Sequence, residues 1–160
     1  MSVAVLILTV AAALGAGAVS GVFFAYSTFT MSALRRLAPA SGAAAMQSIN
    51  REAPRAPLMT LMFGTAAASL ALAVVAALDP GESSSAYLLL GAAVYLIGVV
   101  AITAAYHVPR NERLGALDPE SAEGVAYWGV YLREWVRMNH VRTVAPLVAA
   151  ALYVTALQVG

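Results

Sequence analysis

The chain has 160 residues, of which 61% are hydrophobic and 11% are charged, whereas an average soluble domain carries about 25% charged residues. Its net charge is +1 and it has no block of basic residues, so no nucleic-acid-binding surface is expected. The absence of Cys excludes disulfides, thiolate metal sites and cysteine nucleophiles, and the absence of Lys excludes a Schiff base.

Four long apolar runs without a charged residue follow one another along the chain, at residues 3–29, 56–78, 86–106 and 143–159. About 20 apolar residues cross a bilayer core of roughly 30 Å, and the first three runs reach that length. The first run lacks a basic n-region and is too long for a signal peptide, so we expect it to be retained. The sequence therefore predicts four spans rather than a soluble bundle, at about residues 3–34, 56–78, 86–107 and 139–159.

The nine basic residues are all Arg and lie only in the two longer connections. Between the first two runs lie Arg35, Arg36, Arg51 and Arg55, and between the last two lie Arg110, Arg113, Arg133, Arg137 and Arg142. Both chain ends and the loop after residue 78 contain none. The positive-inside rule then predicts a multi-pass protein of the cell membrane, with both long connections cytoplasmic and both termini outside.

The connections complete the predicted architecture. Asp79, Pro80 and Gly81 are turn formers, so the second and third spans form an antiparallel hairpin. Residues 41–53 are expected to form a helix capped by Ser41, and residues 119–139 a helix capped by Asp118 that can run on into the fourth span. The predicted fold class is all-α: one integral membrane domain, an up-down four-helix bundle with extra helices in the two cytoplasmic connections.

Two details concern the helices themselves. Pro109 disfavours helical geometry at Val108, so the third span is expected to end at His107. Gly17 and Gly21 form a pair of small residues one turn apart, which fits close packing within the bundle as well as the seam of a homo-oligomer.

Most of the unusual polar residues fall at the cytoplasmic end of the predicted bundle. At about 100° per residue, Trp135, Asn139 and Arg142 share one helix face with Tyr131, and His140 lies on its flank. The full set of site candidates is Tyr26, Asn50, His107, Asn111, Tyr131, Trp135, Asn139, His140 and Arg142. Each alone has a structural interpretation as an interfacial aromatic, a capping amide or a headgroup contact. The functional hypothesis depends on their convergence at one depth.

Four segments carry a family resemblance: GVFFAYSTFTMSAL, MQSIN, HVPRNERLGALDP and WVRMNHVRTV. In this order on four spans, they resemble the anthrone oxygenase family over nearly the whole chain. The most specific parts are the Pro109-Arg110-Asn111 step and the spacing of Trp135, Asn139 and Arg142. Glu112 stands where many relatives carry a second Asn, a departure that bears on the choice of substrate.

The resemblance implies a membrane-embedded oxygenase for a flat, lipophilic aromatic substrate and dioxygen. The family's fungal members oxidise anthrones to anthraquinones during aromatic polyketide synthesis. In that chemistry a base removes a methylene proton, and the resulting anion reacts with dioxygen directly. No flavin or haem is required, and the chain has no dinucleotide fingerprint. No cofactor is therefore expected, and the partners are the substrate, dioxygen and membrane lipid.

On this interpretation the candidate residues take distinct roles. His107 is the preferred base over His140. Arg142 and Asn139 stabilise an anionic oxygen, and Asn111 is a further catalytic candidate. The remaining candidates are expected to bind the substrate, the aromatic ones by stacking on its rings: Tyr26, Asn50, Tyr131 and Trp135.

Two other functions remain open from the sequence. In a metal-dependent oxidoreductase, His107 and His140 would share a copper or iron ion with Glu52, Glu112 or a Met. A non-enzymatic protein would bind a lipid, a quinone or a partner in the same place. The absence of an acidic residue clearly paired with either His favours this second alternative, because catalytic imidazoles are usually oriented by another group.

Overall fold

The computed structural model describes the whole chain, Met1 to Gly160, and contains helices but no strand. Four helices are long and apolar enough to cross a membrane, and they confirm the predicted all-α membrane bundle. The first helix joins α1 (Val3–Ala25), the π-helical segment η1 (Tyr26–Thr30) and α2 (Met31–Arg35). Next come α3 (Pro39–Glu52) and α4 (Ala56–Leu78). The third long helix joins α5 (Ser85–Tyr95), the π-helical segments η2 (Leu96–Ala101) and η3 (Thr103–His107), and α6 (Val108–Ala116), and α7 (Ala122–Val159) follows.

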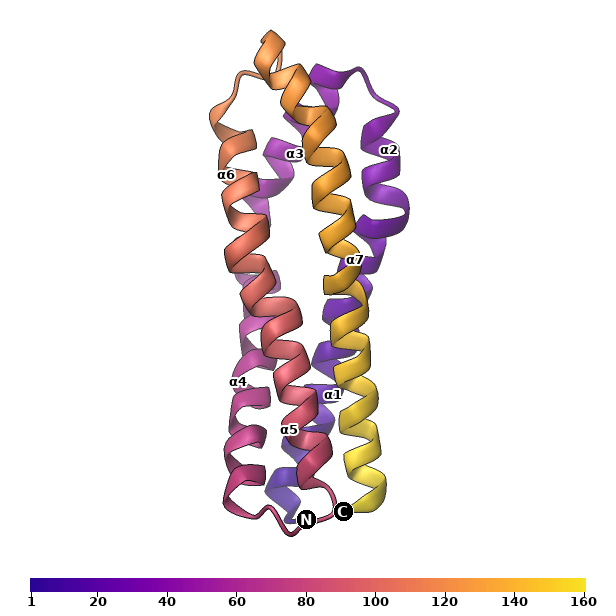
Figure 1. The fold of residues 1–160 in the computed structure, drawn as a ribbon, viewed down its shortest axis with the longest axis vertical. Helices are drawn as coiled ribbons and strands as arrows, with labels where there is room; N and C mark the ends of the chain where they lie inside the picture. Colours follow the sequence, from indigo (N-terminus) through magenta and orange to yellow (C-terminus); the bar gives the residue numbers. More distant parts are fainter.

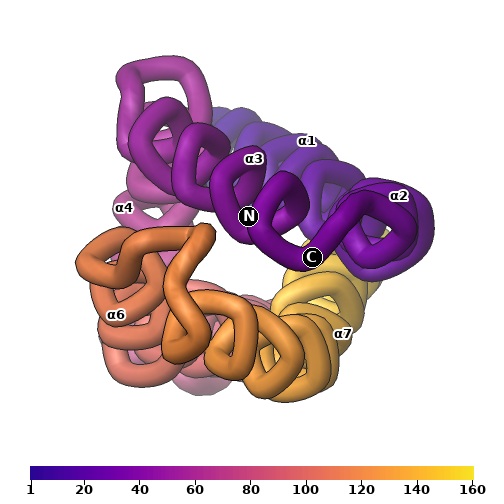
Figure 2. The backbone as a smooth tube through the Cα atoms, turned by 90° about the horizontal axis from the view of Figure 1, so that it is seen from above, coloured from indigo at the N-terminus to yellow at the C-terminus, as the bar shows by residue number.

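The four long helices run side by side, with both chain ends at the same end of the bundle (Figure 1). At the opposite end lie α2, α3, α6 and the start of α7. We call this the arginine-rich end, because these helices and the turns that join them contain Arg35, Arg36, Arg51, Arg55, Arg110, Arg113, Arg133 and Arg137. Seen from this end, α3 runs from α2 toward α4, over the α1 side of the bundle (Figure 2). Which side of a membrane this end faces remains the prediction drawn from the arginines.

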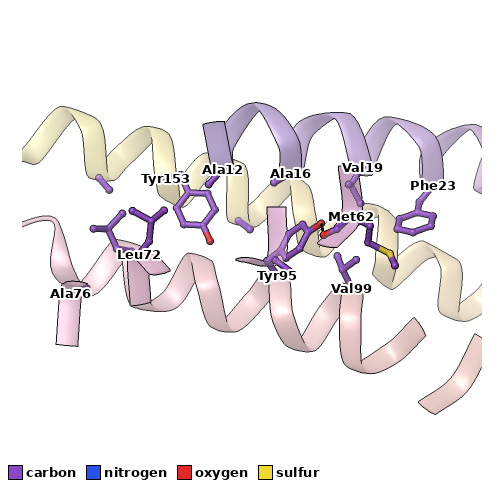
Figure 3. Packing of buried hydrophobic residues seen from close by; sticks show 14 residues of the cluster. Ala12, Ala16, Val19, Phe23, Met62, Leu72, Ala76, Tyr95, Val99 and Tyr153 are labelled. Carbon is purple, nitrogen blue, oxygen red and sulfur yellow. Dashed lines mark hydrogen bonds between the residues drawn. The ribbon is translucent and has the colours of Figure 1, made fainter. Parts of the chain in front are cut away.

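The core of the bundle combines small residues with hydrogen-bonded tyrosines (Figure 3). Ala12 and Ala16 of α1 are fully buried, so the neighbouring helices approach closely. The Tyr95 hydroxyl donates to the Met62 carbonyl at 3.0 Å, and the Tyr153 hydroxyl to Ser69 Oγ at 2.8 Å. Because lipid tails are as apolar as the side chains, such packing and hydrogen bonds, rather than exclusion of water, hold membrane helices together.

Glycines mark where the helix backbones lie closest. A Cβ at Gly98, in η2, would collide with the Ala145 side chain of α7. A Cβ at Gly17 would meet no atom within 4 Å, and the same holds at Gly21. The Gly17–Gly21 pair is therefore not a packing surface inside the bundle, and the homo-oligomer remains a prediction.

The expected end of the third helix at His107 is wrong. The helix continues through Pro109 to Ala116. In an α-helix the ring of Pro109 would clash with the carbonyl four residues earlier. Here the preceding turn is π-helical, with the Val108 N–H donating to the Thr103 carbonyl five residues back. We attribute the continuation to this wider turn, because π-bulges and prolines often share a helix distortion.

The two helix starts predicted in the connections also shift. α3 begins at Pro39 rather than Ser41, with proline in the first turn and no side-chain cap. α7 begins at Ala122, where Ser121 Oγ accepts from the Gly124 N–H at 3.0 Å. Asp118, the predicted cap, instead accepts from the Glu120 N–H in the preceding turn. The expected continuation of this helix into the fourth span is confirmed, since α7 is a single helix of 38 residues.

The close approach at Gly98 gives a stability prediction. Gly98→Ala should destabilise the bundle by about 1–3 kcal/mol, the usual cost of overpacking, because Ala145 has no flexible side chain that can move aside. Gly17→Ala, the matched control, should be neutral or stabilising by up to about 1 kcal/mol, the helix-propensity difference between the two residues. Unfolding of the purified protein in mixed detergent micelles measures both. Equal effects would contradict the close helix contact.

Candidate functional site

A cavity of about 310 Å³ lies inside the arginine-rich half of the bundle. This volume is at the lower end of the range for small-molecule sites, roughly 300–1,000 Å³. Its walls come from all four long helices and from α3, and most are apolar, including Phe23, Met46 and Met62. The polar lining consists of Tyr26, Asn50, Thr103, Asn111, Trp135 and Arg142. A second hollow, of about 350 Å³, lies against the exposed residues Thr28, Arg35 and Arg133 and shares no residue with this cavity.

The Arg142 guanidinium faces the cavity without a carboxylate partner. Its side chain is 5% exposed. Nη2 donates to Asn139 Oδ1 at 2.7 Å and Nη1 to Thr103 Oγ1 at 3.3 Å, whereas Nε has no partner. The guanidinium carbon lies 4.3 Å from the centre of the Phe23 ring and 5.1 Å from that of Trp135. The two ion pairs of the chain, Glu52–Arg55 and Arg110–Glu134, lie elsewhere. The cavity wall thus contains a buried cation that lacks a counter-ion.

Asn139 anchors Arg142 to the first helix. Its side chain is fully buried, and Nδ2 donates to the Phe23 carbonyl at 2.8 Å and to Ser27 Oγ at 2.9 Å. These partners flank the start of η1, where π-helical geometry interrupts regular α-helical pairing. With both amide hydrogens directed at the first helix, Oδ1 is oriented toward Arg142. Asn139 therefore positions the guanidinium and does not itself line the cavity.

A second network fixes the amide of Asn111. The Tyr131 hydroxyl donates to Asn111 Oδ1 at 2.7 Å, and Trp135 Nε1 donates to the same oxygen at 3.0 Å. Asn50 Nδ2 in turn donates to the Tyr131 hydroxyl at 3.4 Å. An indole N–H can only donate, so Asn111 must present its oxygen to Trp135. Its NH₂ group is left for a ligand, and Asn111 lines the cavity.

His107 lies one layer behind the cavity wall. It is fully buried, and its ring meets the edge of the Trp135 ring at a centroid distance of 5.1 Å. Neither Nδ1 nor Nε2 has a hydrogen-bond partner. His107 does not line the cavity, whereas Thr103, Trp135 and Arg142 do. Its role as a base stays a prediction. That role requires a path by which a proton can pass from the cavity to His107 through this wall.

The structure brings eight of the nine sequence candidates into one region, but not all of them onto the cavity wall. On the wall lie Tyr26, Asn50, Asn111, Trp135 and Arg142, and behind it lie His107, Tyr131 and Asn139. The expected stacking of a substrate on Tyr131 does not fit this placement. The Tyr131 ring is 1% exposed and stacks between Trp128 and Trp135, at centroid distances of 5.8 and 6.1 Å.

His140 is not part of the site. It is exposed on α7, while its neighbour Asn139 faces the interior, and its expected catalytic role has no support in this geometry. The metal alternative needed His140 and the buried His107 in one site, and the structure does not join them. No group of three or more His, Asp or Glu side chains arranged to hold a metal ion occurs in the chain.

Sequence reasoning missed Thr103 and the methionines of the cavity wall. Thr103 lies four residues before His107, a spacing that would place both on one face of a regular α-helix. That spacing was a usable signal for a hydroxyl at the same depth. Met46, Met59 and Met62 carry no comparable signal, because apolar residues in a bundle are as easily lipid-facing or core residues.

The bonds of Asn139 generate a second stability prediction. Asn139→Ala should lower stability by about 1–3 kcal/mol, the cost of leaving buried polar groups unpaired, because the Phe23 carbonyl and Arg142 Nη2 both lose a partner. His140→Ala, at the adjacent exposed position, should change stability by no more than about 0.5 kcal/mol. Thermal unfolding in one detergent compares the two variants. A similar small change in both would show that Asn139 is not a structural anchor.

Comparison with known proteins assigns the chain to a family. A family model described as anthrone oxygenase matches residues 57–152, which is 96 of the 160 residues. The matched region contains most of α4, the third helix and α7 as far as Leu152, and with them Asn111, Asn139 and Arg142. The partners that these networks have on the first helix and on α3 lie outside it. No curated protein and no solved structure matches the chain. Since the match covers more than half of its length, the protein belongs to the anthrone oxygenase family.

Proposed function

We propose that this protein is a membrane-embedded oxygenase that oxidises a flat, lipophilic aromatic substrate of the anthrone type with dioxygen. The observation that carries the proposal is the buried Arg142 guanidinium, without a counter-ion, on the wall of a mostly apolar cavity. The apolar walls suit a fused ring system. The cation suits a carbonyl oxygen of the substrate that becomes negatively charged during the reaction, and family membership supplies the reaction class.

The proposed reaction begins with loss of a proton from the methylene group of the anthrone. The negative charge of the resulting anion is shared between that carbon and the carbonyl oxygen across the ring. The carbon then bonds to dioxygen and forms a hydroperoxide, which loses water to leave a second carbonyl. One oxygen atom enters the quinone, and the other leaves as water with the two methylene hydrogens. The balance requires only the substrate and dioxygen.

The residues of the cavity would stabilise the anion. Preorganised donors in a water-poor site stabilise developing charge more strongly than the same donors in water. Arg142 is preorganised by Asn139 and Thr103, and Asn111 offers its NH₂ group because Tyr131 and Trp135 occupy its oxygen. We propose that these two side chains contact oxygen atoms of the substrate while Phe23 and Tyr26 face its rings.

His107 is the proposed proton acceptor. It is the imidazole next to Trp135, and both of its nitrogens lack a partner in the protein. The competing function, binding of a lipophilic anion or quinone without turnover, is favoured by one observation, the absence of an imidazole or carboxylate on the cavity wall.

The first test is oxygen uptake on a simple anthrone by the purified protein in detergent, measured before and after chelation. We expect one dioxygen consumed per quinone formed, in protein that metal analysis shows to be free of copper and iron. Activity that disappears with the metal would overturn the cofactor-free part of the proposal. Absence of uptake in both states, with tight binding of the anthrone, would favour the non-enzymatic alternative.

The proposed roles make separate kinetic predictions. Arg142→Gln should lower kcat by about 10²–10³, the range seen when an oxyanion donor is removed, because the glutamine amide is shorter than the guanidinium and carries no charge. His107→Gln should lower kcat by a factor of about 10²–10⁴, the typical contribution of a general base. His140→Ala, on the exposed face, should retain wild-type activity. Wild-type rates in Arg142→Gln would refute charge stabilisation, and wild-type rates in His107→Gln would place the base elsewhere.

A further inference from the structure

We propose that the cavity takes its ligand sideways from the lipid phase, through a portal between α4 and the third helix. The rim of this portal is formed by Leu58 and Phe63 on α4 and by Ala104 and Val108 on the third helix. The inference rests on the proposed function only in taking the ligand to be a lipophilic molecule. The portal itself follows from the way the cavity is closed at its end and exposed at its side.

The arginine-rich end of the cavity is closed by α3. Gln47 Nε2 donates to the carbonyls of Leu114 and Leu117, at 2.8 Å each, which ties α3 to the end of α6. Gly42 lies so close to Trp128 that an added Cβ would stand 3.1 Å from its ring and 2.8 Å from the Leu34 carbonyl oxygen. Met46 is buried beneath this contact and forms part of the cavity lining. A ligand coming from water at this end would have to displace a bonded, packed helix.

The side of the cavity is not closed in this way. α4 packs against α1, α5 and η2, but it has no comparable packing against η3, which follows η2 on the third helix. α6 lies beyond the start of α4, toward the arginine-rich end (Figure 1). Residues that line the cavity here also reach the outer surface. Phe63 is 52% exposed, Val108 is 41% exposed and Ala104 is exposed. A side chain that both lines a cavity and faces outward marks the opening of that cavity.

The depth and chemistry of the rim identify the surroundings as acyl chains. All four rim residues are apolar. Phe63 lies seven residues inside α4, which is about 10 Å along the helix axis at 1.5 Å per residue. The exposed Arg55–Glu52 pair lies before α4, and Arg110 lies beyond Val108, paired with Glu134. The rim therefore extends from the level of these charged residues, at Leu58 and Val108, into the apolar band of the bundle at Phe63.

Trp135 provides a direct probe, because it lines the cavity and the chain has only one other tryptophan. In a Trp128→Phe variant, Trp135 fluorescence is measured in phosphatidylcholine vesicles with brominated or unbrominated acyl chains, and with iodide in the water. We expect brominated chains to quench Trp135 at least twofold and iodide to have little effect. Stronger quenching by iodide, or none by brominated chains, would overturn the portal.

A matched pair of variants tests the position of the opening. Ala104→Leu places a larger side chain on the rim and should reduce quenching by brominated chains at least twofold. Ala93→Leu is the control, since Ala93 is exposed on the same helix, eleven residues earlier, and does not line the cavity. Equal quenching in both variants would refute an opening at Ala104. If Trp128→Phe is unstable, the same pair is compared in the two-tryptophan protein.

This test uses neither the substrate nor turnover, so its outcome is separate from that of the proposed function. Quenching by lipid in a protein that does not oxidise anthrones would support the portal and refute the reaction. Oxidation by a protein whose Trp135 is not reached by lipid would support the reaction and refute the portal.

Discussion

A buried guanidinium sets the main constraint on this bundle. Removing a cation from water costs several kcal/mol after relaxation, and Arg142 has no carboxylate to offset that cost. Compensation comes from Asn139 Oδ1, from Thr103 Oγ1 and from the faces of Phe23 and Trp135. These groups belong to the first helix, the third helix and α7. The three helices must therefore be in one register at this depth, or the cation loses its partners.

Two of the π-helical segments, η1 and η3, lie where polar side chains join these helices. At η1 the backbone hydrogen bonds change from the α-helical to the π-helical pattern, and Asn139 donates to the nearby Phe23 carbonyl. At η3 the wider turn carries the third helix past Pro109, and this continuation places Asn111 beside Tyr131 and Trp135. π-bulges are frequent at functional sites. Here η1 lies next to Asn139 and η3 next to Arg142, so each of these two distortions adjoins a polar side chain from another helix.

Hydropathy and helical periodicity were sufficient for the spans and for the inward face of α7. Trp135, Asn139 and Arg142 are buried together, and His140, on the flank of their face, is exposed. The same periodicity could not place His107 behind the wall. A π turn shifts the phase of every residue after it, and the sequence gives no sign of that turn. Whether a side chain lines a cavity or lies one layer behind it depends on contacts between helices distant in the sequence, as Tyr131 illustrates.

The division of the cavity between helices has an evolutionary consequence. Its polar groups come mainly from α7 and the third helix, where they are bonded to one another, while the first helix, α3 and α4 supply mainly apolar surface. Met46, Met59 and Met62 line the cavity without a bond to Arg142 or Asn111, so exchanging one of them for another apolar residue would change the shape of the cavity and leave both polar networks in place. Substitutions at a few apolar positions of the cavity wall could therefore change which molecules the fold accepts, while the polar networks around Arg142 and Asn111 stay the same.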